Sequence, residues 1–210
     1  MKYLKMLGLA AVAAMALTAL LGAGSVSATV LCKTYVTPCP KGWDYAAGTE
    51  IHATEAAGVS SVFSSTGAET FDECADATIK GKTTNTGSAT ETVVGNIEAM
   101  TFSECTSTLT VLEMGQFEIH YLGPKTKGAL TVKKTKVTGT LFGVSCIFGA
   151  GSGTEIGVME SDESTEAEIT VEAVLAKEGG SFLCPGDIVW DAKYVITSPK
   201  PLYFKEKMEA

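Results

Sequence analysis

The clearest structural signal in the chain is the stretch Ile188-Val189-Trp190-Asp191-Ala192-Lys193-Tyr194-Val195-Ile196. Every second position of it carries a side chain suited to a buried face: Ile188, Trp190, Ala192, Tyr194 and Ile196. A period of two is the period of a β-strand that buries one face. We therefore expect a core strand here, with Trp190 and Tyr194 in the core rather than on a binding surface.

The same period of two recurs along most of the chain from Thr49 onward. Glutamate, alanine and leucine in 165–177 favour a helix by propensity, but apolar and polar residues alternate there, which indicates a strand. Further strands are expected at 117–121, 129–132, 137–141 and 144–148. The sequence therefore predicts an all-β protein, either a disulfide-stabilised β-sandwich or an irregular β-barrel.

The first 28 residues have the pattern of a secretory leader. A short basic head precedes an apolar run over 6–21, and Val26-Ser27-Ala28 offers small residues for cleavage before Thr29. No later stretch reaches the roughly 20 apolar residues that a membrane span needs. We expect a signal peptide over 1–28 and a single β domain over 29–210. This domain would be secreted, extracellular or loosely associated with the cell surface, without membrane insertion.

The charge of the chain argues against a nucleic-acid partner. Sixteen basic residues, all of them lysine, face 24 acidic ones, for a net charge of −8. Loss of Lys2 and Lys5 with the leader would take the net charge to −10. Nucleic-acid binding depends on cations that neutralise phosphates, and arginine is the residue that grips them bidentately. The expected partner is instead an extracellular ligand, a glycan or a protein.

All six cysteines lie beyond the expected leader: Cys32, Cys39, Cys74, Cys105, Cys146 and Cys184. An exported chain with an even number of cysteines is expected to form disulfides, and six cysteines allow 15 pairings. Pairing each cysteine with the next one along the chain is the simplest scheme. The octets 70–77 and 101–108, which hold Cys74 and Cys105, match at four of eight positions. This echo indicates either two neighbouring strands or a duplicated module.

Neither a metal site nor a cofactor is expected. His52 and His120 each follow a glutamate by two residues, so both pairs could hold one metal only if their strands were adjacent. Solvated strand faces are the simpler interpretation. The acidic loop 160–166 could offer oxygens to calcium but lacks EF-hand spacing, and it is expected to be a charged hairpin tip. The glycine-rich loop 149–154 lacks the last glycine of the dinucleotide fingerprint.

The motifs favour a non-catalytic binding or structural protein over an enzyme. Neither Ser145 nor Ser152 lies in a Gly-x-Ser-x-Gly elbow. A carbohydrate-active hydrolase remains the alternative, because a glycosidase carboxylate pair leaves no local pattern. Its first candidate residues are Glu118, Asp187 and Asp191, which lie close to aromatic residues. For ligand binding, the best exposed aromatic pair is expected to be Trp43 and Tyr45, just after Cys39-Pro40.

Two segments carry a resemblance to known sequences. Trp190-Asp191-Ala192-Lys193-Tyr194 followed by 197–203 resembles the close of an uncharacterised family of secreted β-rich proteins from high-GC Gram-positive bacteria. The start of the expected mature chain, with Cys32, Cys39 and Gly48-Thr49, is similar to the same group. The resemblance implies a lineage and an exported β-rich fold, and it carries over no functional residue.

Overall fold

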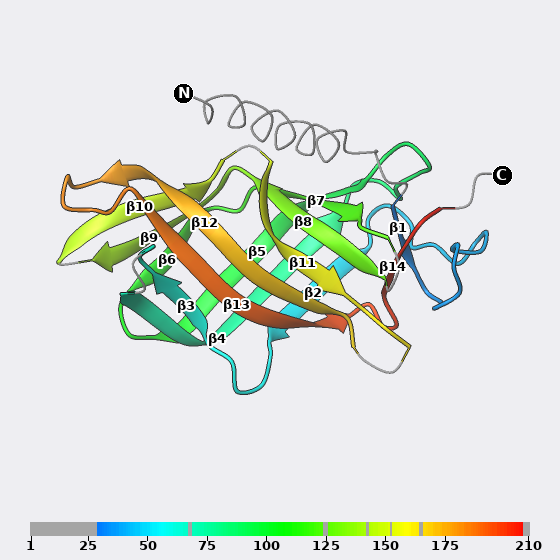
Figure 1. Ribbon diagram of the computed structural model, residues 1–210, viewed down its shortest axis with the longest axis horizontal. Helices are drawn as coiled ribbons and strands as arrows, with labels where there is room; N and C mark the ends of the chain where they lie inside the picture. The colour runs from blue at the N-terminus through cyan, green and yellow to red at the C-terminus, as the bar shows by residue number, and fades with distance from the viewer. Residues whose placement is uncertain are drawn as a thin grey trace, which may run out of the picture.

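A computed structural model describes residues 29–66, 69–123, 126–141, 143–151, 153–163 and 166–207. The expected signal peptide over 1–28 lies outside these residues. Within them the chain forms strands joined by turns and short loops (Figure 1). The strands are β1 (Val30–Cys32), β2 (Glu50–Glu55), β3 (Ser61–Ser64), β4 (Thr70–Thr83), β5 (Val93–Cys105), β6 (Leu109–Glu113), β7 (Gln116–Tyr121), β8 (Lys127–Lys133), β9 (Thr135–Leu141), β10 (Val144–Ala150), β11 (Thr154–Glu160), β12 (Glu168–Gly180), β13 (Asp187–Ser198) and β14 (Tyr203–Lys205).

Twelve of these strands form one antiparallel ring with eight places around it. Four of these places are each occupied by two short strands: β2 with β3, β6 with β7, β8 with β9, and β10 with β11. The long strands β4, β5, β12 and β13 each fill a place alone. The chain visits the eight places in order, and β13 closes the ring by pairing with both β2 and β3. Of the two expected forms, the structure is the irregular β-barrel.

The barrel has one unpaired seam among the described strands. β7 pairs with β5 over Val93–Asn96, and the Ile97 amide donates to the Gly115 carbonyl just beyond this pairing. β6 pairs with β9 and not with β5, so the rest of β5 has no hydrogen-bonded strand on that side. β13 and β12 form the longest continuous register opposite this seam, from Glu168↔Val195 to Ala176↔Asp187. The strand β12 runs to Gly180, past the expected end at 177, because Gly179 and Gly180 still pair with β10.

The barrel interior has an aromatic half and an aliphatic half. Trp190 stacks on Phe63 with ring centroids 5.9 Å apart and meets Phe102 and Tyr194 edge to face. Trp190 and Tyr194 are buried, as the alternation predicts. The other half is filled by isoleucine, leucine and methionine side chains from β2, β5, β7, β8, β11 and β12. The core is continuous from one end of the barrel to the other.

Three disulfides join the cysteines in the sequential scheme: Cys32–Cys39, Cys74–Cys105 and Cys146–Cys184. Cys74 and Cys105 lie directly opposite each other on β4 and β5. The two echoing octets are therefore neighbouring strands that share one disulfide. The expected glycine loop is shorter than 149–154, because Gly149 and Ala150 pair with β9 and Thr154 begins β11.

The two ends of the described chain meet beside the barrel. β1 and β14 pair with each other alone, from Val30↔Lys205 to Cys32↔Tyr203. We call β1, β14 and the segment 33–49 the terminal module. The buried Phe204 joins this module to the barrel core. Its smaller core consists of Val30 and the Cys32–Cys39 disulfide.

Candidate functional site

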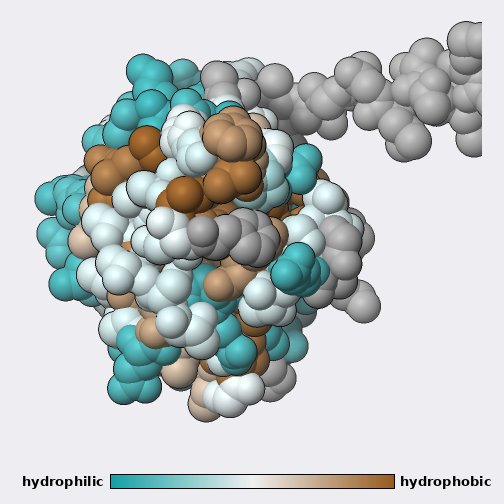
Figure 2. Space-filling model, turned by 90° about the vertical axis from the view of Figure 1, so that its left-hand side faces the viewer, coloured by the Kyte–Doolittle hydropathy of each residue, from teal (hydrophilic) through white to brown (hydrophobic). Residues whose placement is uncertain are grey.

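The most exposed aromatic side chain of the described residues lies at one end of the barrel. We call the connection between β12 and β13, residues 181–186, the tip loop. Phe182 in this loop is 90% exposed and Leu183 is 52% exposed. Figure 2 looks onto this end of the molecule and shows apolar residues gathered there among hydrophilic surroundings. Exposed apolar patches of this kind mark contact surfaces more often than single exposed residues do.

Covalent and polar contacts fix the conformation of the tip loop. The Cys146–Cys184 disulfide ties it to β10. The Lys177 ammonium donates to the carbonyl oxygens of Ser181, at 2.8 Å, and Cys184, at 3.4 Å. The amide of Cys184 donates back to the Ser181 carbonyl, and the amide of Leu183 donates to the Ser181 hydroxyl. The loop therefore presents Phe182 and Leu183 from a pre-formed frame.

The outer face of the β12–β13 hairpin leading to the tip loop carries apolar and acidic side chains. Val174, 54% exposed, lies opposite Val189, and one step further from the tip Glu172 lies opposite Asp191. These two exposed carboxylates have no lysine partner among the ion pairs of the described residues. Like charges directly opposite each other on a sheet repel. The approach to the tip is therefore an uncompensated negative surface.

Trp43 and Tyr45, the predicted ligand-binding pair, lie in the terminal module with unequal exposure. Trp43 is 53% exposed, whereas Tyr45 is half-buried and its hydroxyl donates to the Pro201 carbonyl at 2.7 Å. The Lys33 ammonium lies 5.1 Å from the centre of the Tyr45 ring. Burial also raises the pKa of Tyr45. Only Trp43 thus offers a free aromatic face, and ligand binding by the pair stays a prediction.

A surface groove of about 350 Å³ lies where the C-terminal segment leaves the barrel. Pro199, Lys200, Pro201 and Tyr203 form one side of it, and Glu163 and Glu166 contribute to the other. Lys200 and Glu166 form an ion pair across the groove at 2.5 Å. Neither Trp43 nor Tyr45 lines this groove. Lys200 and Glu166 therefore neutralise each other rather than converge on a ligand.

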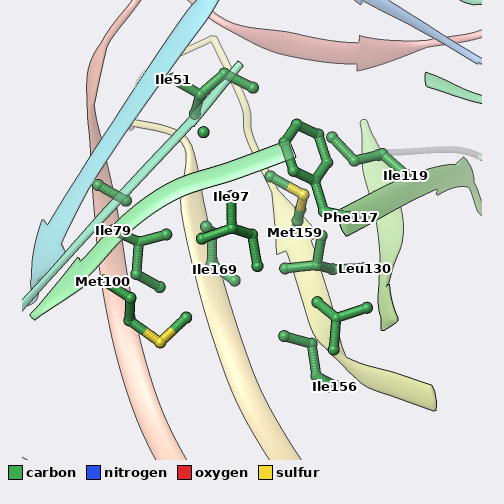
Figure 3. A pocket seen from close by; sticks show the side chains of 13 residues that line it. Ile51, Ile79, Ile97, Met100, Phe117, Ile119, Leu130, Ile156, Met159 and Ile169 are labelled. Carbon is green, nitrogen blue, oxygen red and sulfur yellow. The ribbon is translucent and has the colours of Figure 1, made fainter. Parts of the chain in front are cut away.

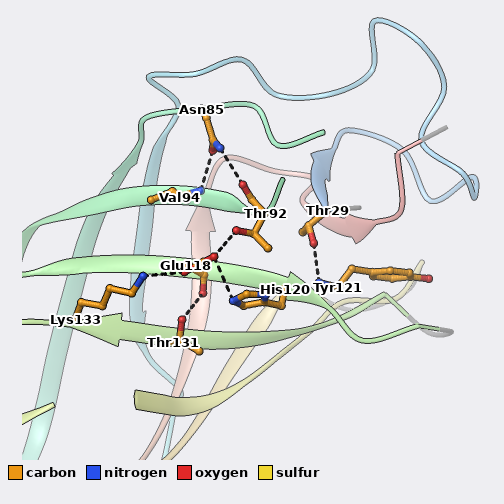
Figure 4. A network of polar contacts seen from close by, with 9 residues as sticks. All are labelled: Thr29, Asn85, Thr92, Val94, Glu118, His120, Tyr121, Thr131 and Lys133. Atoms are coloured by element: carbon orange, nitrogen blue, oxygen red, sulfur yellow. Dashed lines mark hydrogen bonds and ion pairs between the residues drawn. The ribbon is translucent and has the colours of Figure 1, made fainter. Parts of the chain in front are cut away.

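Glu118 is the centre of a polar network on the outer face of β7 (Figure 4). Its carboxylate accepts a 2.5 Å hydrogen bond from the buried Thr92 hydroxyl and a 3.2 Å bond from the Lys133 ammonium. His120 Nε2 lies 3.5 Å from the same carboxylate. The Thr92 bond, assisted by Lys133 and His120 against the effect of burial, holds the pKa of Glu118 below its ordinary value. The network keeps this carboxylate ionised.

We expect Thr92→Val to lower the free energy of unfolding by about 1 kcal/mol at pH 7, the net worth of one hydrogen bond. Because the folded-state pKa of Glu118 is lowered, the stability that its ionised form contributes is present above its ordinary value near 4.5 and is lost as the pH falls through the folded-state value. The cost of Thr92→Val should therefore shrink at pH 3. Urea unfolding at both pH values measures it, with Thr110→Val, exposed on β6, as the control. A cost that is equal at both pH values would contradict the prediction.

The three carboxylates predicted for a hydrolase do not come together. Glu118 is on the outer face of β7, and Asp187 and Asp191 are on the outer face of β13. β7 and β13 are four places apart in a ring of eight, so they form opposite walls. Along β13 the two aspartates are four positions apart, which is about 13 Å of strand and more than the 9.5 Å that glycosidase pairs roughly span. These residues do not form the predicted pair.

The possible metal ligands are equally dispersed. β4 and β5 separate His52 on β2 from His120 on β7, so each histidine has only its own strand's glutamate nearby. In the acidic loop, Glu160 pairs with Lys127. Ser164 and Thr165 lie outside the described residues. Asp72 approaches Cys74 and Cys105, but those sulfurs form a disulfide and the Asp72 carboxylate accepts three hydrogen bonds from Thr106 and Ser107.

In comparisons with known proteins, the chain matches no protein-family model, no curated protein and no solved structure. In the part of the chain that the structure describes, no helix has the length and apolar character to cross a membrane.

Proposed function

We propose that this chain is an exported, non-catalytic binding protein that contacts a protein partner through the tip loop. One observation carries the proposal: Phe182 is 90% exposed on a loop that is held in place by a disulfide and by the hydrogen bond from the Lys177 ammonium to the Ser181 carbonyl. Exposing a phenylalanine to water is unfavourable by about 2 kcal/mol relative to burying it. Contact with a partner would bury the Phe182 side chain and recover this free energy.

The fixed conformation of the tip loop supports a binding role. Ordering a flexible side chain or loop on binding costs about 0.5–1.5 kcal/mol for each immobilised side chain. The disulfide and the hydrogen bonds already order the tip loop when the chain folds, so less conformational entropy is lost on binding. Large apolar anchors that fill a pocket on the partner commonly carry most of the binding energy. Phe182 and Leu183 have the character of such anchors.

The charge beside the tip loop supports a protein partner with a basic rim. Glu172 and Asp191 lie on the outer face of the same hairpin, and no lysine of the described residues forms an ion pair with either of them. A partner surface with an apolar pocket bordered by lysine or arginine would match both features. An anionic membrane would be repelled by this face and by the net charge of −8. The chemistry therefore favours a basic protein surface.

Export is supported by two independent features. The sequence begins with a leader pattern over 1–28. Three disulfides cross-link the described residues, and these disulfides suggest an oxidising environment. Cysteines in a cytosolic protein are kept reduced. A secreted or loosely surface-associated protein is consistent with both features.

A photo-reactive phenylalanine analogue at position 182 tests the proposal. We expect the exported protein, incubated with cells of the producing organism, to form one discrete adduct with another protein. Excess unlabelled wild-type chain should abolish this adduct, whereas excess F182S/L183S chain should not. With the purified partner, F182S/L183S should weaken binding at least about thirtyfold, because one anchor alone contributes about 2 kcal/mol.

The same photo-reactive group at Leu122 is the matched control, because Leu122 is also exposed but follows β7 outside the tip loop. It should give no adduct that competes with wild-type chain. Equal adducts at both positions, an adduct only with a second copy of the chain, or no adduct at all would each contradict the proposal. The F182S/L183S and L122S chains should unfold at the same urea concentration as the wild type, because these side chains are exposed.

A further inference from the structure

Two neighbouring cavities lie inside the barrel, among the described residues. The larger, about 50 Å³, lies in the aliphatic half and has only apolar lining side chains, among them Met100, Met159 and Ile156. The smaller, about 20 Å³, lies in the aromatic half against Phe63, Phe102 and Trp190. Well-packed interiors hold few voids larger than a water molecule. An eight-place barrel is wide enough either to be filled by side chains or to hold one small ligand.

Only a few side chains separate the two cavities. Met100, Val132 and Ile156 line both of them. Figure 3 shows Met100 and Ile156 together at one end of the larger cavity, with Ile51 at the opposite end. Methionine is unbranched, rotates freely and adapts to irregular spaces. Of the three shared side chains, Met100 is the one that we expect to rotate aside when a ligand joins the two cavities into one elongated apolar chamber.

One buried hydrogen-bond donor on a residue that lines the smaller cavity has no acceptor. Trp190 lines the smaller cavity, is 4% exposed, and its Nε1 is buried without a hydrogen-bond partner. A buried polar group left unpaired is unfavourable by about 1–3 kcal/mol, so such groups are rare in native proteins. Among the described residues, only one other buried side-chain atom, Glu55 Oε2, shares this condition. The indole N–H of Trp190 is available to a molecule that brings its own acceptor.

We propose that the barrel interior binds a small, uncharged, mostly apolar molecule that carries one hydrogen-bond acceptor, such as a ketone, with Trp190 Nε1 donating to that acceptor. The hydrocarbon part of the ligand occupies the larger cavity, where no lining side chain is polar. The acceptor reaches the smaller cavity beside Trp190. This function is separate from the proposed tip-loop contact, because the chamber is inside the barrel.

A lone water molecule is a poorer occupant of the smaller cavity than this ligand. A buried water needs two to four polar partners. Apart from Trp190, Thr135 is the only polar side chain among the described residues that line the smaller cavity, and its hydroxyl donates to the Met114 carbonyl. A water accepting from Trp190 would thus have one side-chain acceptor for its own two hydrogens. A carbonyl accepts from the indole and has no hydrogen left to satisfy.

Titration with acetone and propane, which are small enough for cavities of about 50 and 20 Å³, followed by NMR of the folded chain, tests the proposal. Both should shift the methyl signals of Met100 and Met159, and only the ketone should move the Trp190 indole N–H signal downfield. Trp43 is the one other tryptophan and lies on the surface, so its indole signal is the internal control. No shift of the methionine methyls with either molecule would overturn the proposal. Equal effects of both molecules on the Trp190 signal would overturn the role of the acceptor.

Two variants sharpen the test. Trp190→Phe removes the donor and should lower the ratio of acetone affinity to propane affinity about tenfold relative to the wild type. Met159→Ala enlarges the chamber and should tighten binding of both molecules about tenfold. Val171→Ala is the matched control, because Val171 is buried but lines neither cavity. If Val171→Ala tightened binding as much as Met159→Ala, the chamber would not be the site.

Discussion

Replacing Cys146 and Cys184 together by alanine is expected to lower the free energy of unfolding by about 4 kcal/mol. The disulfide joins residues 38 apart, and a closed loop of this size removes roughly that much chain entropy from the unfolded state. The bond also ties the tip loop to β10. Urea unfolding at constant pH measures the loss. Hydrogen exchange at the backbone amides of positions 183 and 184 should be faster in the same variant.

The Cys32–Cys39 disulfide provides the matched control. Its cysteines are only 7 residues apart, so the same chain-entropy argument gives about 2 kcal/mol for C32A/C39A. This variant alters the terminal module and should leave exchange in the tip loop unchanged. A larger loss for C32A/C39A than for C146A/C184A, or tip-loop exchange that is the same in both variants, would contradict the argument.

The strands were predictable because burial on one face is a local property. On β12 and β13 the sheet buries every second side chain, so Ile169, Val171, Trp190 and Tyr194 show a period of two in the sequence itself. The sequential disulfides were the simplest of 15 schemes for a similar reason. The chain visits neighbouring places of the barrel in order, so cysteines that follow each other in sequence also lie close in space.

The closure of the barrel was not predictable from these patterns. β13 pairs with β2 and β3, so Ile196 lies opposite Ala53 and Trp190 opposite Phe63, far back in the chain. Alternation reports that a strand has a buried face and carries no information about which strand lies beside it. The sharing of one place by two short strands depends on the same non-local pairs. Sandwich and barrel therefore remained equal alternatives at the level of sequence.

The candidate site was only partly predictable. The spacing of Glu118 and His120 placed them on one strand face, but Thr92 and Lys133, which complete the network, come from other segments. Phe182 was not singled out, although a signal existed: Phe182-Leu183 lies between Gly179-Gly180 and Cys184-Pro185-Gly186. An apolar pair inside a turn-forming segment beside a cysteine predicts exposed side chains on a fixed loop. The position of Trp43 just after Cys39-Pro40 predicts an exposed side chain, and Trp43 is exposed.

Replacement by alanine should lower the free energy of unfolding strongly at one tryptophan and hardly at the other. Trp190→Ala is expected to lower the free energy of unfolding by about 4 kcal/mol, because a buried ring that packs on Phe63, Phe102 and Tyr194 is replaced by a cavity. Trp43→Ala should change it by less than about 0.5 kcal/mol, because its side chain is 53% exposed. The contrast tests whether the β13 face is the centre of the core.

Urea unfolding followed by far-ultraviolet circular dichroism measures both changes without relying on the fluorescence that the variants alter. The wild type, Trp43→Ala and Trp190→Ala should share one slope against urea if only stability changes. A cost for Trp190→Ala as small as that for Trp43→Ala would mean that the aromatic half collapses around the missing ring. The loss of three ring contacts within a closed barrel argues against such a collapse, because β13 pairs with strands on both sides and cannot move inward alone.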